Sequence, residues 1–174
     1  MIKPKNPPYD GTEVDPNQSR VEIDKLLRSY GIQKIIWASD YERNDVQLAF
    51  ETEAEIQGVR KIFTVMLRPP LILKNARIYN RQKGVTEKVK IPDWPRSMRI
   101  LFWYVKAKIE AVAYGLASVE KEFLSQVIVS LPDGNRTVGE VLEPIMLDEK
   151  LSTIPALLHI KKVEVVKEER IIDV

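Results

Sequence analysis

The apolar residues of this chain change their spacing near Gly31, and that change limits the fold more than any other feature of the sequence. From Val21 to Tyr30 the apolar side chains recur every three or four residues, which predicts an amphipathic helix. We expect Ser19 and Glu22 to begin this helix as a capping box, and Gly31 to end it. Beyond Gly31 apolar and polar residues alternate, as they do in a half-buried strand. The chain therefore starts as a helix and continues as strands.

Three short strands are predicted after this helix, at residues 33–38, 46–52 and 58–67. Their alternating apolar residues share one face: Val46, Leu48, Phe50, Phe63, Val65 and Leu67. Pro69 and Pro70 end the third strand, because a proline cannot donate a hydrogen bond to a ladder. We expect an antiparallel meander with the first helix packed on one side.

A basic stretch follows at residues 71–92, and it contains one glycine. Its pattern is compatible with two strands joined by a turn near Lys83-Gly84. We therefore expect a hairpin arm between the meander and the next helix.

A long helix is predicted next, with Asp93 as its cap, Pro95 in its first turn and its end near Gly115. At 100° per residue this sequence divides into two faces. The buried stripe is expected to be Met98, Leu101, Val105, Ile109, Val112 and Leu116. The opposite face carries Arg96, Arg99, Trp103 and Lys106, with Glu110 closing the row. A tryptophan amid a row of cations is the most specific functional signal in the sequence.

The C-terminal third is expected to be a small, mainly helical part. Its expected features are a helix at 118–129, a turn at Asp133-Gly134, a Thr137-x-x-Glu140 capping box, a brief helix stopped by Pro144, and a strand at 160–167. The predicted fold class is α+β: a three-stranded antiparallel meander with an N-terminal helix, a long central amphipathic helix and this C-terminal part. Residues 1–18 are rich in proline and are predicted to form an arm, and residues 19–174 a single domain.

Charge is distributed very unevenly along the chain. The formal net charge of all 174 residues is only +2, but residues 74–108 hold ten basic and two acidic side chains, a net +8. Five aromatic residues lie among them. Clustered positive charge points to a polyanionic partner, whereas a nearly neutral total does not.

Nucleic acid is the polyanion that this combination of cations and aromatics favours. Guanidinium and ammonium groups neutralise phosphates, and an indole offers a platform on which an unpaired base stacks. The predicted binding residues are Arg96, Arg99, Trp103 and Lys106 on the long helix, with Arg77, Tyr79, Arg81, Lys83, Lys88 and Lys90 on the arm. Two alternatives stay open: Trp103 packs under residues 71–92 or against a second copy, and the basic segment is a solvated face.

No catalytic constellation is recognisable. The chain has no cysteine and a single histidine, His159, so zinc sites and Ser-His-Asp triads are not expected. Asp148 to Lys150 matches the end of a nuclease pattern only superficially, because it falls in a predicted loop. The acidic tip at Asp40, Glu42 and Asp45 is compatible with weak binding of a hard cation, and a solvated loop explains it equally well. We expect no enzyme activity, no cofactor and no metal.

The compartment follows from what the sequence lacks. No apolar run approaches the roughly 18 residues that a membrane span requires, and the first residues do not resemble a signal peptide. We expect a cytoplasmic protein with no membrane partner. The abundance of Lys, Glu, Ile and Val is compatible with a thermophilic source.

Two stretches resemble a group of small uncharacterised phage and prophage proteins. One is MRILFWYVKAKIEAVAYGLASVEKEFL followed by DGNRTVGE, and the other is the order helix, YG, strand, VQLAFETE, strand, LRPP. The matching positions are Arg99, Ala107, Gly115, Glu120, Phe123, Leu124, Asp133, Gly134, Arg136, Thr137 and Glu140. This chain departs from the group at Asn135, at Trp103-Tyr104 and in its Pro-rich arm. The group has no assigned activity, so the resemblance implies a viral origin, and hence the host cytoplasm, without a function.

The sequence therefore predicts a non-enzymatic, nucleic-acid-binding accessory protein of viral DNA replication or recombination. Single-stranded DNA is the preferred partner over duplex DNA or RNA, because Trp103 stacks only on an unpaired base. The alternative is a protein–protein adaptor or a self-assembling homo-oligomer, in which the basic segment docks on an acidic surface.

Overall fold

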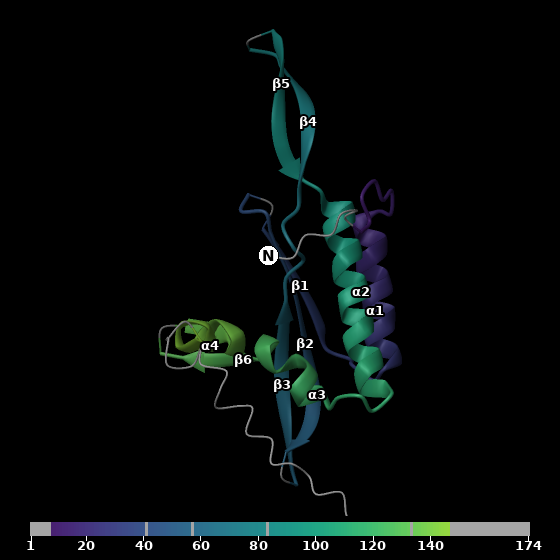
Figure 1. Cartoon of the computed structure of the whole chain (residues 1–174), viewed down its shortest axis with the longest axis vertical. Helices are drawn as coiled ribbons and strands as arrows, with labels where there is room; N and C mark the ends of the chain where they lie inside the picture. Colours follow the sequence, from purple (N-terminus) through teal and green to yellow (C-terminus); the bar gives the residue numbers. More distant parts are fainter. Residues whose placement is uncertain (1–7, 41, 57, 83, 133, 147–174) are drawn as a thin grey trace, which may run out of the picture.

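The structure is a computed structural model that describes residues 8–40, 42–56, 58–82, 84–132 and 134–146 (Figure 1). A three-stranded antiparallel sheet carries two long helices on one face, and two further β-hairpins and several short helices complete the chain. The predicted α+β fold, with its meander and its long second helix, is confirmed. His159, the Asp148 to Lys150 triplet and the strand predicted at 160–167 lie outside the described residues.

The sheet has the order β1-β2-β3, with strands β1 (Ile35–Asp40), β2 (Asp45–Ile56) and β3 (Val59–Leu67). Phe50 in the middle strand lies opposite Ile35 on one side and Val65 on the other. This register places the predicted apolar residues on one face of the sheet, where Val46, Leu48, Phe50, Val65 and Leu67 are buried and Phe63 packs against them. The alternation of the sequence therefore identified the core face correctly.

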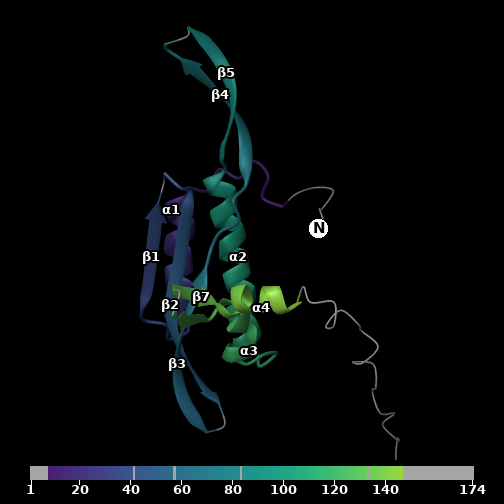
Figure 2. The same ribbon diagram turned by 90° about the vertical axis from the view of Figure 1, so that its left-hand side faces the viewer.

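Helices α1 (Pro16–Ser29) and α2 (Trp94–Ala113) lie side by side on that face (Figures 1 and 2). They contribute Ile23, Leu27, Met98, Leu101, Val105 and Ile109 to the core. The predicted stripe was wrong at its end, because α2 stops at Ala113 and Leu116 is 82% exposed. Gly115 has φ +71°, the left-handed conformation that suits a helix end.

The predicted start of α1 was also wrong. Asp15 is the N-cap residue, and its Oδ1 accepts a hydrogen bond from the Asn17 amide at 2.7 Å. Pro16 fits the first helical position, where a missing N–H costs nothing. Ser19 therefore lies inside the helix and is fully buried. The Glu22 carboxylate accepts a hydrogen bond from Arg99. The predicted Pro-rich arm of residues 1–18 accordingly overlaps α1 by three residues.

The hairpin predicted in the basic stretch is confirmed. Strands β4 (Leu73–Asn80) and β5 (Val85–Pro92) pair with each other and project away from the sheet and the helices (Figures 1 and 2). Gly84 at the turn has φ +65°, a backbone conformation that residues with a side chain rarely adopt. We call residues 73–92 the arm. Its base is fixed by the Asp93 amide, which donates to the Ile72 carbonyl at 2.7 Å.

The predicted helix at 118–129 was wrong beyond its first turns. Helix α3 (Val119–Phe123) and a 3-10 turn, η1 (Leu124–Gln126), are followed by strand β6 (Ile128–Leu131). Strand β6 pairs with β7 (Gly134–Thr137), and a bridge from Val127 to Val65 attaches this hairpin to β3. Pairing with β7 and the bridge to β3 therefore override the local helical pattern.

The capping box before the last helix is confirmed. The Thr137 amide donates to Glu140 at 2.8 Å, and the Glu140 amide donates to the Thr137 hydroxyl at 3.2 Å. Helix α4 (Val138–Met146) does not stop at Pro144, as predicted, but contains it. The lost hydrogen bond of the proline is thus tolerated within two residues of the helix end.

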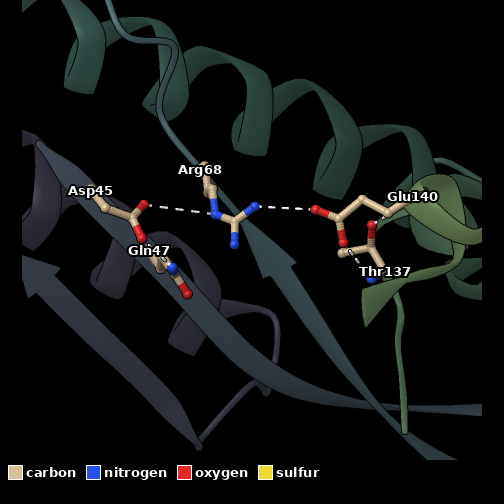
Figure 3. A network of polar contacts seen from close by, with 5 residues as sticks. All are labelled: Asp45, Gln47, Arg68, Thr137 and Glu140. Atoms are coloured by element: carbon tan, nitrogen blue, oxygen red, sulfur yellow. Dashed lines mark hydrogen bonds and ion pairs between the residues drawn. The ribbon is translucent and has the colours of Figure 1, made fainter. Parts of the chain in front are cut away.

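A polar network joins helix α4 to the sheet (Figure 3). Arg68, directly after β3, lies 3.7 Å from the Asp45 carboxylate and 3.2 Å from that of Glu140. Gln47 donates to the other oxygen of Asp45 at 2.5 Å. The Thr137 amide, and then the Thr137 hydroxyl and Arg68, hold the pKa of Glu140 below its ordinary value. Arg68 therefore bridges β2 and α4 across the β3 edge.

Candidate nucleic-acid interface

The ten basic side chains of residues 74–108 separate into two groups in the structure. Five of them form ion pairs: Lys74 with Asp93 (3.3 Å), Arg96 with Asp10 (3.1 Å), Arg99 with Glu22 (2.5 Å), Lys106 with Glu110, and Lys108 with Glu122 (2.9 Å). Four of the five acids lie outside residues 74–108, and the fifth is Asp93, at the start of the helix. The charge of the long helix is therefore largely balanced within the fold.

Arg99 connects the two long helices. It donates to the Glu22 carboxylate of α1, and its guanidinium lies 4.5 Å from the ring centroid of Phe102 and 5.5 Å from that of Trp103. The hydrogen bond from Arg99 holds the pKa of Glu22 below its ordinary value. Arg99 therefore has a structural role between α1 and α2, and its charge is already partnered.

Lys106 and Lys108 are held in the same way. Lys106 bonds to Glu110 one turn later, and this partner raises the pKa of Lys106. Lys108 donates to both the carbonyl and the carboxylate of Glu122, and it lies 5.0 Å from the Tyr104 ring centroid. Both lysines thus brace the C-terminal half of α2 rather than extend into solvent.

Trp103 is 40% exposed, and its partner comes from the beginning of the chain. The ring of Tyr9 lies parallel to it, with centroids 6.5 Å apart and planes 7° apart. Arg96, about two turns before Trp103 in α2, donates to the Pro8 carbonyl at 3.2 Å and to the Asp10 carboxylate at 3.1 Å. Residues 8–10 therefore cover the predicted stacking site. None of the alternatives predicted for Trp103 included this contact.

The arm carries the second group of cations. In its register Arg77 lies opposite Lys88, Asn75 opposite Lys90, and Tyr79 opposite Thr86. Successive residues of a strand point to opposite faces, so all six of these side chains share one face. All of them are exposed, and Tyr79 is 61% exposed. We call this the cationic face of the arm.

The cationic face is electrostatically unbalanced. Within the described residues no carboxylate pairs with Arg77, Lys88 or Lys90, and Glu87 points to the opposite face, across from Ile78. Like charges directly opposite each other on a ladder destabilise it. The pairing of Arg77 with Lys88 thus costs folding free energy, and a bound anion would remove that cost.

The opposite face of the arm is mainly apolar, with Ala76, Ile78, Val85, Val89 and Ile91. Ile78 and Val85 are about half exposed, because the arm stands clear of the core. Arg81 is exposed at the tip, and Lys83 lies outside the described residues. Trp94, which the sequence placed in the charged stretch, packs against the core instead.

Other kinds of site find little support in the part of the chain that the structure describes. It contains no group of three or more His, Asp or Glu side chains placed to hold a metal ion. Asp40 at the acidic tip accepts hydrogen bonds from the amides of Glu42 and Arg43, and Asp45 binds Arg68, as a structured turn requires. None of the described helices is long and apolar enough to cross a membrane.

Comparisons with protein-family models, with curated proteins and with solved structures gave no match for this chain. The resemblance to phage and prophage proteins therefore stays a prediction. The candidate interface rests on the geometry of the arm and of α2 alone.

Sequence reasoning missed two features of this interface. The alternation of Arg77, Tyr79 and their neighbours was visible in the sequence, and with a two-strand register it predicts the cationic face. The contact of Tyr9 with Trp103 joins residues 94 positions apart, and no local pattern signals it.

Proposed function

We propose that this chain binds nucleic acid through the cationic face of its arm. The observation that carries the proposal is that Arg77, Lys88 and Lys90 share one exposed face on which no described carboxylate lies. Phosphate backbones bind such surfaces by releasing condensed counterions, which makes the affinity strongly dependent on salt. An arm of eight residue pairs extends about 26 Å, enough to follow several phosphates.

Single-stranded DNA is the partner that we propose, as the sequence predicted. Tyr79 is exposed between the cations, and a ring in that position stacks only on a base that is unpaired. Such stacking contributes roughly 1–3 kcal/mol per base. The wider role that we propose, as a non-enzymatic accessory of viral DNA replication or recombination, rests on the family resemblance.

The test is fluorescence anisotropy of labelled single-stranded DNA, duplex DNA and RNA oligonucleotides, titrated with the full chain at 50 and 200 mM salt. We expect binding to single-stranded DNA, weaker binding to the duplex, and a steep loss of affinity at the higher salt. An absence of binding to all three at 50 mM salt contradicts the proposal.

Two matched variants test whether the arm is the surface that binds nucleic acid. The triple variant R77Q/K88Q/K90Q removes three charges from the cationic face, and K25Q/R28Q/K121Q removes three charges from exposed positions on α1 and α3. Both have the same net charge. We expect the first to lose binding and the second to keep it; equal losses would mean that only total charge matters.

A second candidate function is self-assembly through charge complementarity. The face of the sheet that points away from the helices carries Glu51, Glu53 and Glu55 at alternate positions of β2. Glu51 is paired with Lys34, whereas the structure gives no described partner for Glu53. An arm of one copy docked on this face of another makes a head-to-tail contact that generates rings or filaments. Light scattering at low and high salt tests it, since screening should reduce the assembly to monomers.

A further inference from the structure

The contacts of residues 8–10 on α2 match, group by group, those of a nucleotide. Tyr9 places a flat ring parallel to Trp103, where a base would stack. Asp10 places a carboxylate 3.1 Å from the guanidinium of Arg96, where a phosphate oxygen would bind. The Pro8 carbonyl accepts a second bond from the same guanidinium at 3.2 Å. An aromatic ring and an anion from adjacent residues are thus held at two positions of one helix, about two turns apart.

The surface under this segment is built to hold such a pair. With residues 8–10 in place, the side chain of Arg96 is only 14% exposed. The Trp103 ring lies edge-on to Phe102, with centroids 5.2 Å apart, and the Arg99 guanidinium and the Lys106 ammonium lie within 5.8 Å of its centre. Both cations are themselves paired with carboxylates, Arg99 with Glu22 and Lys106 with Glu110, so they hold the ring in place, and Arg96 is the group that would bind a phosphate.

The segment itself is held less firmly than the surface that it covers. The carboxylate of Asp10 is 71% exposed, and exposed ion pairs contribute little to stability. Tyr9 has φ +61°, in the left-handed region that is costly for residues other than glycine. The Thr12 amide donates to the Tyr9 carbonyl at 3.2 Å, so this conformation belongs to a local turn.

The covered surface also lies beside the arm. Strand β5 ends at Pro92, and Arg96 is in the first turn of the helix that follows. From Arg96 to Trp103 the helix rises about 10 Å. Arg96 is therefore nearer to the base of the arm, and Trp103 lies about two turns further from it.

We infer that Trp103 and Arg96 form a second nucleic-acid subsite, which takes one unpaired nucleotide, and that residues 8–10 occupy it as an internal competitor. This inference rests on the proposed function, because it assigns the arm and this subsite to the same strand. The competitor lowers the apparent affinity for single strands by the fraction of molecules in which the subsite is covered. Duplex DNA is affected less, because its phosphates can reach Arg96 but its bases are not available to Trp103.

The test compares the full chain with the variant Y9A/D10N, which removes the ring and the anion of the competitor. We expect Y9A/D10N to bind a single-stranded oligothymidine roughly threefold to tenfold more tightly than the unmodified chain. Its affinity for duplex DNA should rise by a clearly smaller factor, because a duplex gains only the phosphate contact of Arg96. Equal or weaker binding of the single strand by Y9A/D10N overturns the inference.

A fluorescence measurement assigns the gain to the subsite. In Y9A/D10N the oligothymidine should quench emission from Trp103, which is isolated by subtracting the spectrum of Y9A/D10N/W103F. The gain in affinity should disappear in Y9A/D10N/W103L and also in Y9A/D10N/R96Q, so that a folding defect in either variant leaves the other as a test. If the gain in affinity persists in both of these variants, the inference is contradicted.

The arm variant R77Q/K88Q/K90Q separates this inference from the proposed function. If it loses binding while Y9A/D10N behaves like the unmodified chain, only the subsite is refuted. If Y9A/D10N gains affinity while the arm variant binds normally, the subsite is supported and the role of the arm is refuted. If no form binds any oligonucleotide, both are refuted.

Discussion

Arg77 and Lys88 lie directly opposite each other across the two strands of the arm. A folding ladder gains nothing from this pairing, since facing like charges destabilise it. The rest of the basic stretch behaves differently, because Arg99 and Lys106 are each satisfied by a carboxylate of the same fold. The arm is thus the part of the stretch whose charge the fold leaves unbalanced, and this contrast is the basis of the proposed function.

Reversing one charge of that pair should affect stability and binding in opposite directions. In Lys88→Glu an attractive cross-strand pair with Arg77 replaces a repulsive one, which should stabilise the arm by a few tenths of a kcal/mol. The same substitution places an acid on the cationic face and should weaken binding to single-stranded DNA. Amide hydrogen exchange in β4 and β5 measures the first effect, and anisotropy the second. Unchanged or tighter binding by Lys88→Glu would refute the role of this face.

The core and the arm should differ in their sensitivity to truncation. Phe50 is 2% exposed and contacts Phe123 edge-on, so Phe50→Ala should destabilise the protein by about 3–5 kcal/mol. Ile78 is half exposed on the arm, and Ile78→Ala should change the free energy of unfolding by less than about 0.5 kcal/mol. Urea denaturation measures both. A large effect of Ile78→Ala would mean that the apolar face of the arm is covered in solution.

Two buried hydroxyl groups should be dispensable for folding. The Oγ atoms of Ser19 and Ser97 are fully buried and have no hydrogen-bond partner among the described residues. Burying an unsatisfied hydroxyl costs free energy, so Ser19→Ala and Ser97→Ala should be neutral or stabilising. Replacing Ser97 by Leu should instead cost about 1–3 kcal/mol, because α2 is close-packed there. A large loss of stability in either alanine variant would show that the hydroxyl has a partner.

Stability should fall as the solution is acidified. Hydrogen bonds to Glu22 from Arg99, and to Glu140 first from the Thr137 amide, lower the pKa of both carboxyl groups in the folded state. The stability that they contribute is therefore complete above the ordinary glutamate pKa and is lost as the pH drops through the lower folded value. Melting temperatures from pH 7 to pH 3 should decline below about pH 5. The decline should be shallower in Glu22→Gln and Glu140→Gln; an unchanged profile in both would contradict the assigned hydrogen bonds.

The elements that the sequence predicted well are those with a strong period and a local end signal. Val46, Leu48 and Phe50 alternate over the first half of β2, and Met98 to Ile109 recur at helical spacing, so burial on one face determined both elements. The capping box of Thr137 and Glu140 is likewise a local feature, with both hydrogen bonds made between residues three positions apart.

The errors arose where distant residues decided the outcome. The predicted helix at 118–129 included Ile128 and Val129, but the ladder with β7 and the bridge from Val127 to Val65 make these two residues part of a strand. Ser19 and Asp15 both resemble helix caps, and only Pro16 distinguishes them, because proline favours the first helical position. The partners of Arg96 and Arg99 lie 86 and 77 positions away, so the sequence could not show that these charges are balanced.

The salt dependence of single-strand binding tests the central claim most directly. Each phosphate contact on a single strand contributes about 0.7 to the slope of log K against log salt concentration. The account predicts that R77Q/K88Q/K90Q lowers the magnitude of this slope by about 2 relative to the unmodified chain, whereas K25Q/R28Q/K121Q leaves it within about 0.5. Equal slopes for the unmodified chain and the arm variant would show that the cationic face does not contact the phosphates.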